Sequence, residues 1–350
     1  MKPPILELGV FALLMGDRKV DIKPFKTVDE QIEILKSRGL KFHDEENAKY
    51  ILTNISYYSL INSYKDLFCT KLTDEKGNCI DNFDNQYFED ILIIYDFDKG
   101  LSKILFDYLS RIEETFRTSI AYNLANNYSH KHTHYISPQN FKRGDIRKNY
   151  KTERENLLKI LNSTVQSNEH PIKYYREKYL NVPPWILVKG LNFGTLYYIY
   201  KLSKPPVKDN IVNVFLFDTI NIEQRKELFF KSMEIVKEYR NKVAHGYRIY
   251  NHKLAIELPK IPLLEYTNSN YYTAELYDNG VGKTGLFSLF MSVIILSSMR
   301  ESVRGNFVND LEKHFHQLKN NNPHLYLSLM SYINLPLNFN DLLSYSLEKD

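Results

Sequence analysis

Apolar residues recur every three to four positions along most of the chain, which is the spacing of an amphipathic helix. The longest such stretch runs from Tyr87 to Tyr128, and Gly100 is the position where it would divide. Strand-like runs are short and lie between Phe68 and Phe83, around a polar turn at residues 74–78. The sequence therefore predicts an all-α bundle with a small β-hairpin near its N-terminal end.

Thr27 and Glu30 have the spacing of a capping box, in which each side chain accepts a hydrogen bond from the other residue's backbone amide. A helix is therefore predicted from Thr27 onward. A second helix is expected over residues 44–52, whereas residues 1–24 are expected to be irregular.

The later part of the chain alternates helical patterns with breaks. Pro184 is expected to begin a helix because proline suits the first helical position. The expected order is a helix over 185–202, a break at Pro205–Pro206, helical segments from about 221 to 245, an irregular stretch over 249–280, an apolar helix over 284–304, an amphipathic helix over 307–319 and a polar tail. These patterns suggest an N-terminal region (1–86), a helical bundle (87–305) and a C-terminal extension (306–350).

Composition narrows the class of protein only modestly. The 350 residues are 43% hydrophobic and 25% charged, with a net charge of +4, which permits a nucleic-acid partner without requiring one. The two cysteines form no zinc-binding pattern, and no cofactor fingerprint is found. The N-terminus lacks the features of a signal peptide, and the longest apolar run, 286–299, is too short to span a bilayer. We expect a cytoplasmic protein that needs no metal.

Arg240-Asn241-Lys242-Val243-Ala244-His245 is the stretch richest in candidate chemistry. An arginine can hold a phosphate with two parallel hydrogen bonds, and a histidine can transfer a proton near neutral pH. These two groups suffice to cleave RNA without a metal. The alternative is a solvated helix end whose Arg240 pairs with Glu238 or Glu234.

Helical geometry separates the residues of this stretch. Glu238, Asn241 and His245 share one face at i, i+3 and i+7. The opposite, apolar face carries Phe229, Met233, Val236, Val243 and Tyr247. Arg240 lies at the edge of the apolar face, well round the helix from His245. The two side chains can converge if the helix end frays, or if the motifs of two chains meet at a two-fold axis. Gly246 suits the end of the helix.

Other candidate features are weaker. Arg117 lies four residues after Glu113, the spacing of an ordinary helical ion pair, although Arg117 could also reach the active site or RNA. A second Arg-x4-His match, Arg38 to His43, is interpreted as a loop. The alternating histidines 130, 132 and 134 are more typical of a polar loop than of a metal site, and residues 280–284 lack the first glycine of a phosphate-binding loop.

Several motifs in the same order resemble the Abi_2-type abortive-infection proteins (the AbiD/AbiF group) of the HEPN superfamily. Residues 23–39 and 54–68 resemble the family's opening. Residues 95–98 with 112–117 resemble its "Y-x-F-D … I-E-x-x-x-R" helix, and residues 183–188 with 193–196 resemble its "P-x-W … F-G-T-L" segment. The RNxxxH motif of residues 240–245 follows in the expected place.

This resemblance implies a HEPN-like helical bundle and a metal-independent endoribonuclease, often a homodimer whose motifs meet across the interface. Arg240, Asn241 and His245 would be catalytic, and the products would carry 2′,3′-cyclic phosphates. Arg117, Glu238, Lys242 and Arg248 are further candidates for binding the RNA substrate. The enzyme would act as a toxin or antiphage effector that is held inactive until triggered. A regulatory noncoding RNA or an antitoxin is a further candidate partner.

Two other functions stay open on the sequence alone. One is a non-catalytic module that binds a small noncoding RNA through the motif and the basic loop 142–151. The other is a protein-interaction scaffold, whose binding would not weaken with salt.

Overall fold

The computed structural model describes residues 24–73, 77, 79–148 and 150–348. Most of the irregular N-terminal lead-in and most of the hairpin turn lie outside these residues. The chain divides into two compact units, Met1–Ile91 and Leu92–Asp350, and each is described separately.

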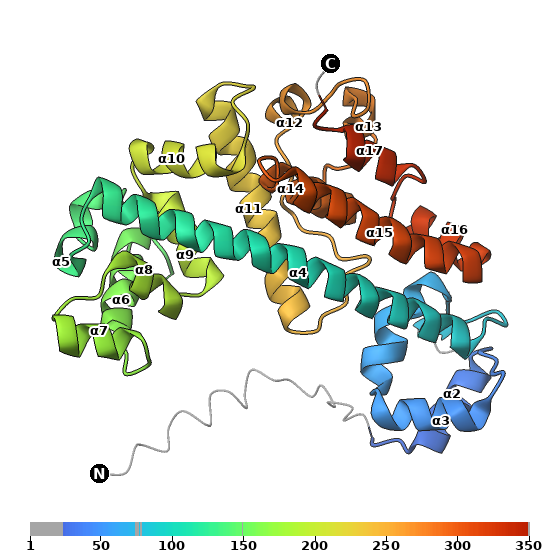
Figure 1. Ribbon diagram of the computed structural model, residues 1–350. Coiled ribbons are helices and arrows are strands. Elements are labelled where there is room, and N and C mark those ends of the chain that lie inside the picture. The colour runs from blue at the N-terminus through green and yellow to red at the C-terminus, as the bar shows by residue number, and fades with distance from the viewer. Residues whose placement is uncertain (1–23, 74–76, 78, 149, 349–350) are drawn as a thin grey trace, which may run out of the picture. The chain divides into compact units, whose positions relative to one another are not determined.

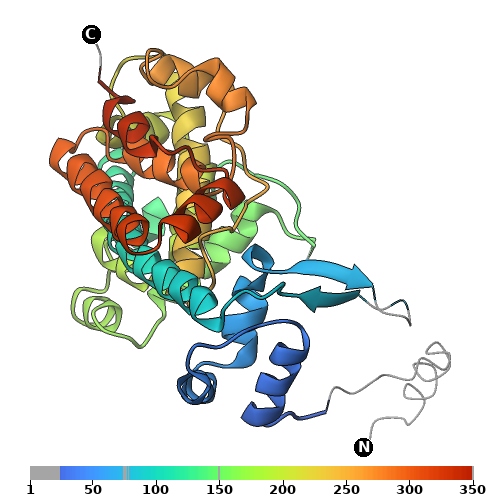
Figure 2. The same ribbon diagram turned by 90° about the vertical axis from the view of Figure 1, so that its right-hand side faces the viewer.

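The first unit consists of short helices and one hairpin. Its elements are α2 (Val28–Ser37), α3 (Glu45–Asn54), the single turns η1 (Tyr58–Asn62) and η2 (Lys65–Leu67), and the strands β1 (Thr70–Thr73) and β2 (Cys79–Asn82). Figure 2 shows the two strands side by side, and Thr70 pairs with Asn82 in antiparallel register. The capping box of Thr27 and Glu30 is present, as predicted.

The second Arg-x4-His match is split apart in this unit. Arg38 pairs with Asp81 at 3.5 Å, and Lys65 reaches the same carboxylate at 2.6 Å. The ring of His43 instead stacks on Tyr87, with 3.9 Å between ring centroids. The two side chains therefore have different partners, which agrees with the interpretation of this match as a coincidence.

One helix, α4 (Phe88–Asn127), is 40 residues long and is drawn in Figure 1 as one continuous helix. At 1.5 Å per residue it extends for about 60 Å. The expected division at Gly100 is wrong, because the helix continues through it. A Cβ at Gly100 would lie 2.4 Å from Cε1 of His314, so glycine serves here to let that imidazole approach.

The remaining elements of the second unit are all helical. They are α5 (His132–Tyr135), η3 (Pro138–Asn140), α6 (Glu153–Val165), α7 (Ile172–Tyr179), α8 (Pro184–Leu187), η4 (Val188–Gly190), α9 (Phe193–Leu202), α10 (Pro205–Phe215), α11 (Ile222–Ala244), α12 (Lys260–Tyr266), α13 (Ala274–Asp278), α14 (Leu286–Leu296), α15 (Glu301–Asn321), α16 (Pro323–Tyr332) and α17 (Phe339–Tyr345). None of the described helices is long and apolar enough to cross a membrane.

An aromatic cluster fixes α11 against α4, which it crosses in Figure 1. Phe116 of α4 and Phe229 of α11 lie 6.0 Å apart, ring to ring. Phe229 also packs on Tyr200 of α9 and Phe215 of α10, at 4.8 and 5.2 Å. All four side chains are buried. The core thus holds the helix that carries the RNxxxH motif.

Two predicted helix boundaries are wrong, and one helix was not predicted. The helix expected over 185–202 breaks after Gly190, and the Asn192 side chain caps α9 by accepting the Thr195 amide at 2.8 Å. The chain breaks just before Pro205–Pro206, as predicted, but these prolines begin the unpredicted helix α10, since proline is favoured in a first turn. The apolar helix stops at Leu296, and a separate helix, α15, starts at Glu301.

Two regions predicted to be irregular contain helices. Residues 249–280 include the short helices α12 and α13, and the expected polar tail folds into α16 and α17. Phe339, Leu342 and Leu343 of α17 are buried. These helices bury too few residues each to give a strong apolar period, so their formation depends on packing.

Candidate functional site

Helix α11 ends at the predicted motif. Asn221 caps its start by accepting the Gln224 amide at 3.0 Å. At the other end the His245 amide donates to the Asn241 carbonyl at 3.1 Å, and Gly246 then turns the chain with a φ of +71°. A positive φ favours glycine, so the predicted helix end at Gly246 is confirmed.

The apolar face of α11 is buried only along its first part. Phe229, Met233 and Val236 are fully buried, as predicted. Val243 is half-buried and Tyr247 is 58% exposed, so their assignment to the core is wrong. The turn at Gly246 takes Tyr247 out of helical register, and the last turn of α11 has solvent beside it. The motif therefore lies where the helix leaves the core.

Arg240 is turned toward α4, where its Nε lies 2.6 Å from Oε2 of Glu113. Glu113 is only 6% exposed. Arg240 therefore does not pair with Glu238 or Glu234, the alternative considered from the sequence. Glu238 contacts Lys237 at 2.7 Å, and Glu234 contacts Lys231 at 3.2 Å. Arg240 is thus anchored to the core by a carboxylate from a distant part of the sequence.

Glu113 also binds Arg117, whose Nη2 donates to Oε1 at 2.7 Å, so the predicted i, i+4 ion pair is present. The Nη1 of Arg117 donates to the carbonyls of Val188 and Leu191, the latter at 2.8 Å. Its side chain is only 13% exposed. This guanidinium ties α4 to the connection between α8 and α9, and it also lines a groove of about 620 Å³ beside Trp185 and Lys189.

The outer part of the Arg240 guanidinium is still available. Its Nε is buried against Glu113, yet the side chain as a whole keeps 30% exposure. Neither Nη group has a hydrogen bond or ion pair to any residue that the structure describes. One carboxylate between two guanidinium groups leaves a net positive charge. The arrangement orients Arg240 while leaving donors for an anion.

Positive groups gather around the exposed end of α11. His245 is exposed and Asn241 is half-buried. Lys242 lies over the Tyr247 ring at 5.0 Å, and Arg248 lies over the Tyr250 ring at 5.8 Å. Lys99 of α4 donates to the Gly246 carbonyl at 3.1 Å. These cations make the helix end suitable for a polyanion.

The backbone just after the motif is held by Asp98 of α4, a fully buried carboxylate. It accepts the amide of Tyr250 at 2.6 Å and that of Ile249 at 3.1 Å. Sequence reasoning paired Glu113 with Arg117 and placed Asp98 in a family motif, but it predicted neither residue's contact with the RNxxxH segment. The available signal was an acidic residue within the apolar pattern of α4, where an unpaired charge would be costly.

His252 follows this anchored segment and packs against α11, with its ring 5.3 Å from that of Tyr239. Burial lowers the pKa of His252, and the nearby cations Lys242 and Arg248 lower it further. The positive charges at the end of α11 thus oppose protonation of this imidazole. His252 therefore favours its neutral form.

Other candidate sites do not form in the described part of the chain. No group of three or more His, Cys, Asp or Glu side chains is placed to hold a metal among these residues. His132 instead bonds Asn181 at 2.9 Å. Residues 280–284 form a turn before α14, and Lys283 pairs with Glu257 at 3.4 Å.

The fold and this site define an all-α protein in which an Arg-Asn-x3-His helix end leaves the core, with the arginine fixed from a second helix. The chain belongs to the Abi_2 family, Abi-like protein, which matches residues 50–251 and so more than half of its length. The matched region contains α4, Arg117 and the whole motif, and it ends just after the segment that Asp98 holds. No curated protein and no solved structure matches the chain.

Proposed function

We propose that this Abi-like protein is a metal-independent endoribonuclease of the HEPN type, acting in abortive infection as a toxic antiphage effector. The observation that carries the proposal is the exposed His245 at a cationic helix end, five residues beyond an arginine whose Nη groups contact no charged or hydrogen-bonding group in the described part of the chain. Family membership supports the defence role. The geometry supplies one group for phosphate binding and one for proton transfer.

In the proposed reaction the RNA 2′-oxygen forms a bond to the adjacent phosphorus while the bond from phosphorus to the 5′-oxygen breaks. The 2′-hydroxyl loses a proton to a base, and the leaving 5′-oxygen gains one from an acid. His245 performs one of these transfers, Arg240 binds the phosphate as charge develops, and Asn241 orients either group. The products are a 2′,3′-cyclic phosphate and a 5′-hydroxyl.

The positions of Arg240 and His245 bear on how many chains make one site. Arg240 is directed toward α4, whereas His245 is at the solvent-exposed helix end. We propose a homodimer in which Arg240 of one chain and His245 of the other act on the same phosphate. Lys242, Arg248 and Glu238, which lie around the motif, are then proposed to contact the RNA strand.

The direct test is cleavage of a single-stranded RNA in EDTA by the wild type, His245→Ala and Arg240→Lys. We expect cyclic-phosphate products from the wild type and a loss of about 10²- to 10⁴-fold in rate for His245→Ala, the range for a lost acid–base group. His130→Ala is the matched control, because His130 is also exposed and its backbone carbonyl, not its side chain, accepts a hydrogen bond from Asn181. Equal cleavage by the wild type and His245→Ala would refute the assigned site.

Mixing two inactive variants tests the composite site. A dimer of Arg240→Lys and His245→Ala chains contains one intact pairing of Arg240 with His245 only if the two residues come from different chains. Recovered cleavage in the mixture supports the composite site. An inactive mixture that still contains mixed dimers contradicts it.

A non-catalytic RNA-binding module is the second candidate function. The exposed basic residues of the 142–151 segment favour it. It predicts that RNA binds with the same affinity to the wild type and His245→Ala, with no product after long incubation.

A further inference from the structure

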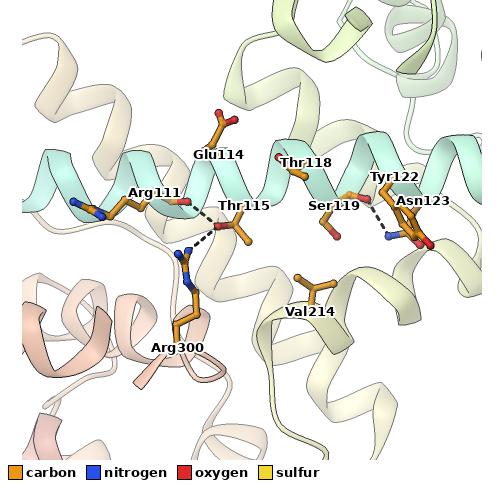
Figure 3. Close-up of a pocket in the computed structure, with 9 residues that line it drawn as sticks. All are labelled: Arg111, Glu114, Thr115, Thr118, Ser119, Tyr122, Asn123, Val214 and Arg300. Atoms are coloured by element: carbon orange, nitrogen blue, oxygen red, sulfur yellow. Dashed lines mark hydrogen bonds between the residues drawn. The ribbon is translucent and has the colours of Figure 1, made fainter. Parts of the chain in front are cut away.

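A second groove lies on the opposite flank of Tyr122 from the one beside Trp185. It has a volume of about 550 Å³, within the range of small-molecule sites, and is bounded by α4, α10 and the connection between α14 and α15. Figure 3 shows Ser119 and Asn123 of α4 facing the same space as Val214 of α10, with Arg300 at the other end. The RNxxxH motif contributes no residue to it.

Two buried polar atoms line this groove without partners. Ser119 is 6% exposed and Asn123 is 3% exposed. The Asn123 amide nitrogen donates to the Ser119 carbonyl at 2.9 Å, but neither Oδ1 of Asn123 nor Oγ of Ser119 has a hydrogen bond to the described residues. An unsatisfied buried polar group costs about 1 to 3 kcal/mol, so two neighbouring ones indicate a missing ligand.

A cation without a carboxylate partner lies at the other end. Arg300 is exposed, and its Nη1 donates to Oγ1 of Thr115 at 3.2 Å. No described acidic side chain lies within ion-pair distance of it. Glu114 also lines the groove, but Figure 3 shows its side chain on the opposite side of α4 from Arg300. The space near Arg300 therefore favours an anion.

Tyr122 adds an aromatic surface beside Asn123, at the end of the groove away from Arg300. It is 67% exposed, so burial in the hydrophobic core does not account for an aromatic ring at this position. The two orphan oxygens are closed off from solvent, so a ligand reaches them only when a side chain that lines the groove moves. From Thr115 to Asn123 the helix rises about 12 Å, enough to separate a phosphate subsite from a ring subsite.

We propose that this groove binds a phosphorylated nucleoside. Arg300 holds the phosphate, Tyr122 stacks on the base, and Ser119 and Asn123 bond the base edge. A base edge presents a donor beside an acceptor, which matches one hydroxyl and one amide oxygen. The ligand is either a free nucleotide or one nucleotide of an RNA strand, and the site is independent of the proposed ribonuclease activity.

The experiment is calorimetric titration of the full chain with the four 5′-monophosphates, the matching nucleosides and a single-stranded 2′-deoxy oligonucleotide. None of these can be cleaved by 2′-hydroxyl attack on an internal phosphate, so binding is measured apart from the proposed reaction. The single tryptophan, Trp185, lines the adjoining groove with Tyr122 and gives a fluorescence signal close to the site.

We expect at least one monophosphate to bind. Ser119→Ala should weaken it by about threefold or more, and Tyr122→Ala by about fivefold or more. Arg300→Ala should weaken it by about tenfold while leaving nucleoside binding unchanged. Ser102→Ala, which removes another unpartnered hydroxyl of α4, and Tyr50→Ala, which removes another exposed ring, should have no effect.

The same titrations separate the two sources of ligand. Tighter binding of a monophosphate than of the oligonucleotide assigns the groove to a free nucleotide, and the reverse order assigns it to a strand. The inference is wrong if no monophosphate binds at millimolar concentration, or if Ser119→Ala, Tyr122→Ala and Arg300→Ala all bind as the wild type does.

Discussion

The carboxylate of Glu113 joins Arg240 at 2.6 Å and Arg117 at 2.7 Å, and so connects the motif helix α11 to α4. Glu113→Gln keeps the shape of this side chain but removes its charge. Two partly buried guanidinium groups would then face each other without compensation. We expect the free energy of unfolding to fall by about 2 to 3 kcal/mol. This is below the usual cost of breaking a buried ion pair, because the Arg240 side chain keeps 30% exposure. Urea unfolding of the wild type and Glu113→Gln measures this difference in stability.

The neighbouring Glu114 provides the control for that measurement. Its side chain is 63% exposed, and its contacts with Arg117 and Lys189 are 4.0 and 3.8 Å long. Glu114→Gln should change the stability by no more than about 0.5 kcal/mol. Equal effects of the two substitutions would contradict the assigned role of Glu113.

Asp98→Asn tests the anchor of the segment after the motif. The substitution replaces one acceptor oxygen with a donor that faces the amides of Ile249 and Tyr250. We expect the free energy of unfolding to fall by about 2 to 3 kcal/mol and hydrogen exchange at those two amides to become faster. Asp96→Asn, an exposed position on the same helix, should leave both quantities unchanged. Unaltered exchange in Asp98→Asn would show that other contacts hold the segment.

Replacing each of two helical glycines with alanine should change the stability of the protein in opposite directions. Gly100→Ala places a Cβ 2.4 Å from His314, and we expect a net loss of about 1 to 3 kcal/mol. Gly305 of α15 has no atom within 4 Å of the same position. Gly305→Ala should stabilise the protein by up to about 1 kcal/mol through helix propensity. Thermal unfolding of both variants distinguishes these outcomes, and a shared sign would refute the packing of His314 on Gly100.

The same histidine gives the folded state a pH dependence. Burial lowers the pKa of His314, whose Nε2 donates to the Phe97 carbonyl at 2.8 Å. The unfolded chain then binds a proton more readily than the folded one as the pH falls below about 6.5. Stability should therefore decrease from about pH 7 to pH 5. His314→Gln should reduce that slope, whereas His316→Gln, exposed on the same helix, should not.

Lys242 is expected to contact the RNA phosphates if the motif end binds the strand. Removing one phosphate contact reduces the slope of log affinity against log salt by about 0.7 for a single strand. We expect this change for Lys242→Ala in an RNA titration at several salt concentrations. Lys159→Ala removes an exposed lysine of α6 and should keep the wild-type slope. An unchanged slope in Lys242→Ala would place the strand elsewhere.

Local signals in the sequence were sufficient for several features of the fold. The capping box at Thr27 needs only residues three apart, and the helix end at Gly246 needs only a positive φ. Both are decided within one turn of backbone. The long α4 follows equally from its apolar period, although Gly100 suggested a division that packing against His314 removes.

Contacts between distant parts of the chain could not be predicted from local sequence patterns. The motif at 240–245 was recognised, but its partner Glu113 was not, because nothing near Arg240 in the sequence specifies which α4 residue it meets. The break before Asn192 was missed since one capping side chain outweighs a continuous apolar pattern. The groove at Ser119 was likewise hidden, because a serine on a helix has no signature until its neighbours are known.

The single helix α4 carries Asp98, Glu113 and Ser119 within 22 consecutive residues. Asp98 holds the segment after the motif, Glu113 orients Arg240, and Ser119 lines the second groove. If the protein is toxic as proposed, a genetic screen for harmless variants would therefore recover substitutions of these α4 residues, far outside the RNxxxH motif. Such variants would be read as catalytic defects although every atom of the motif is intact.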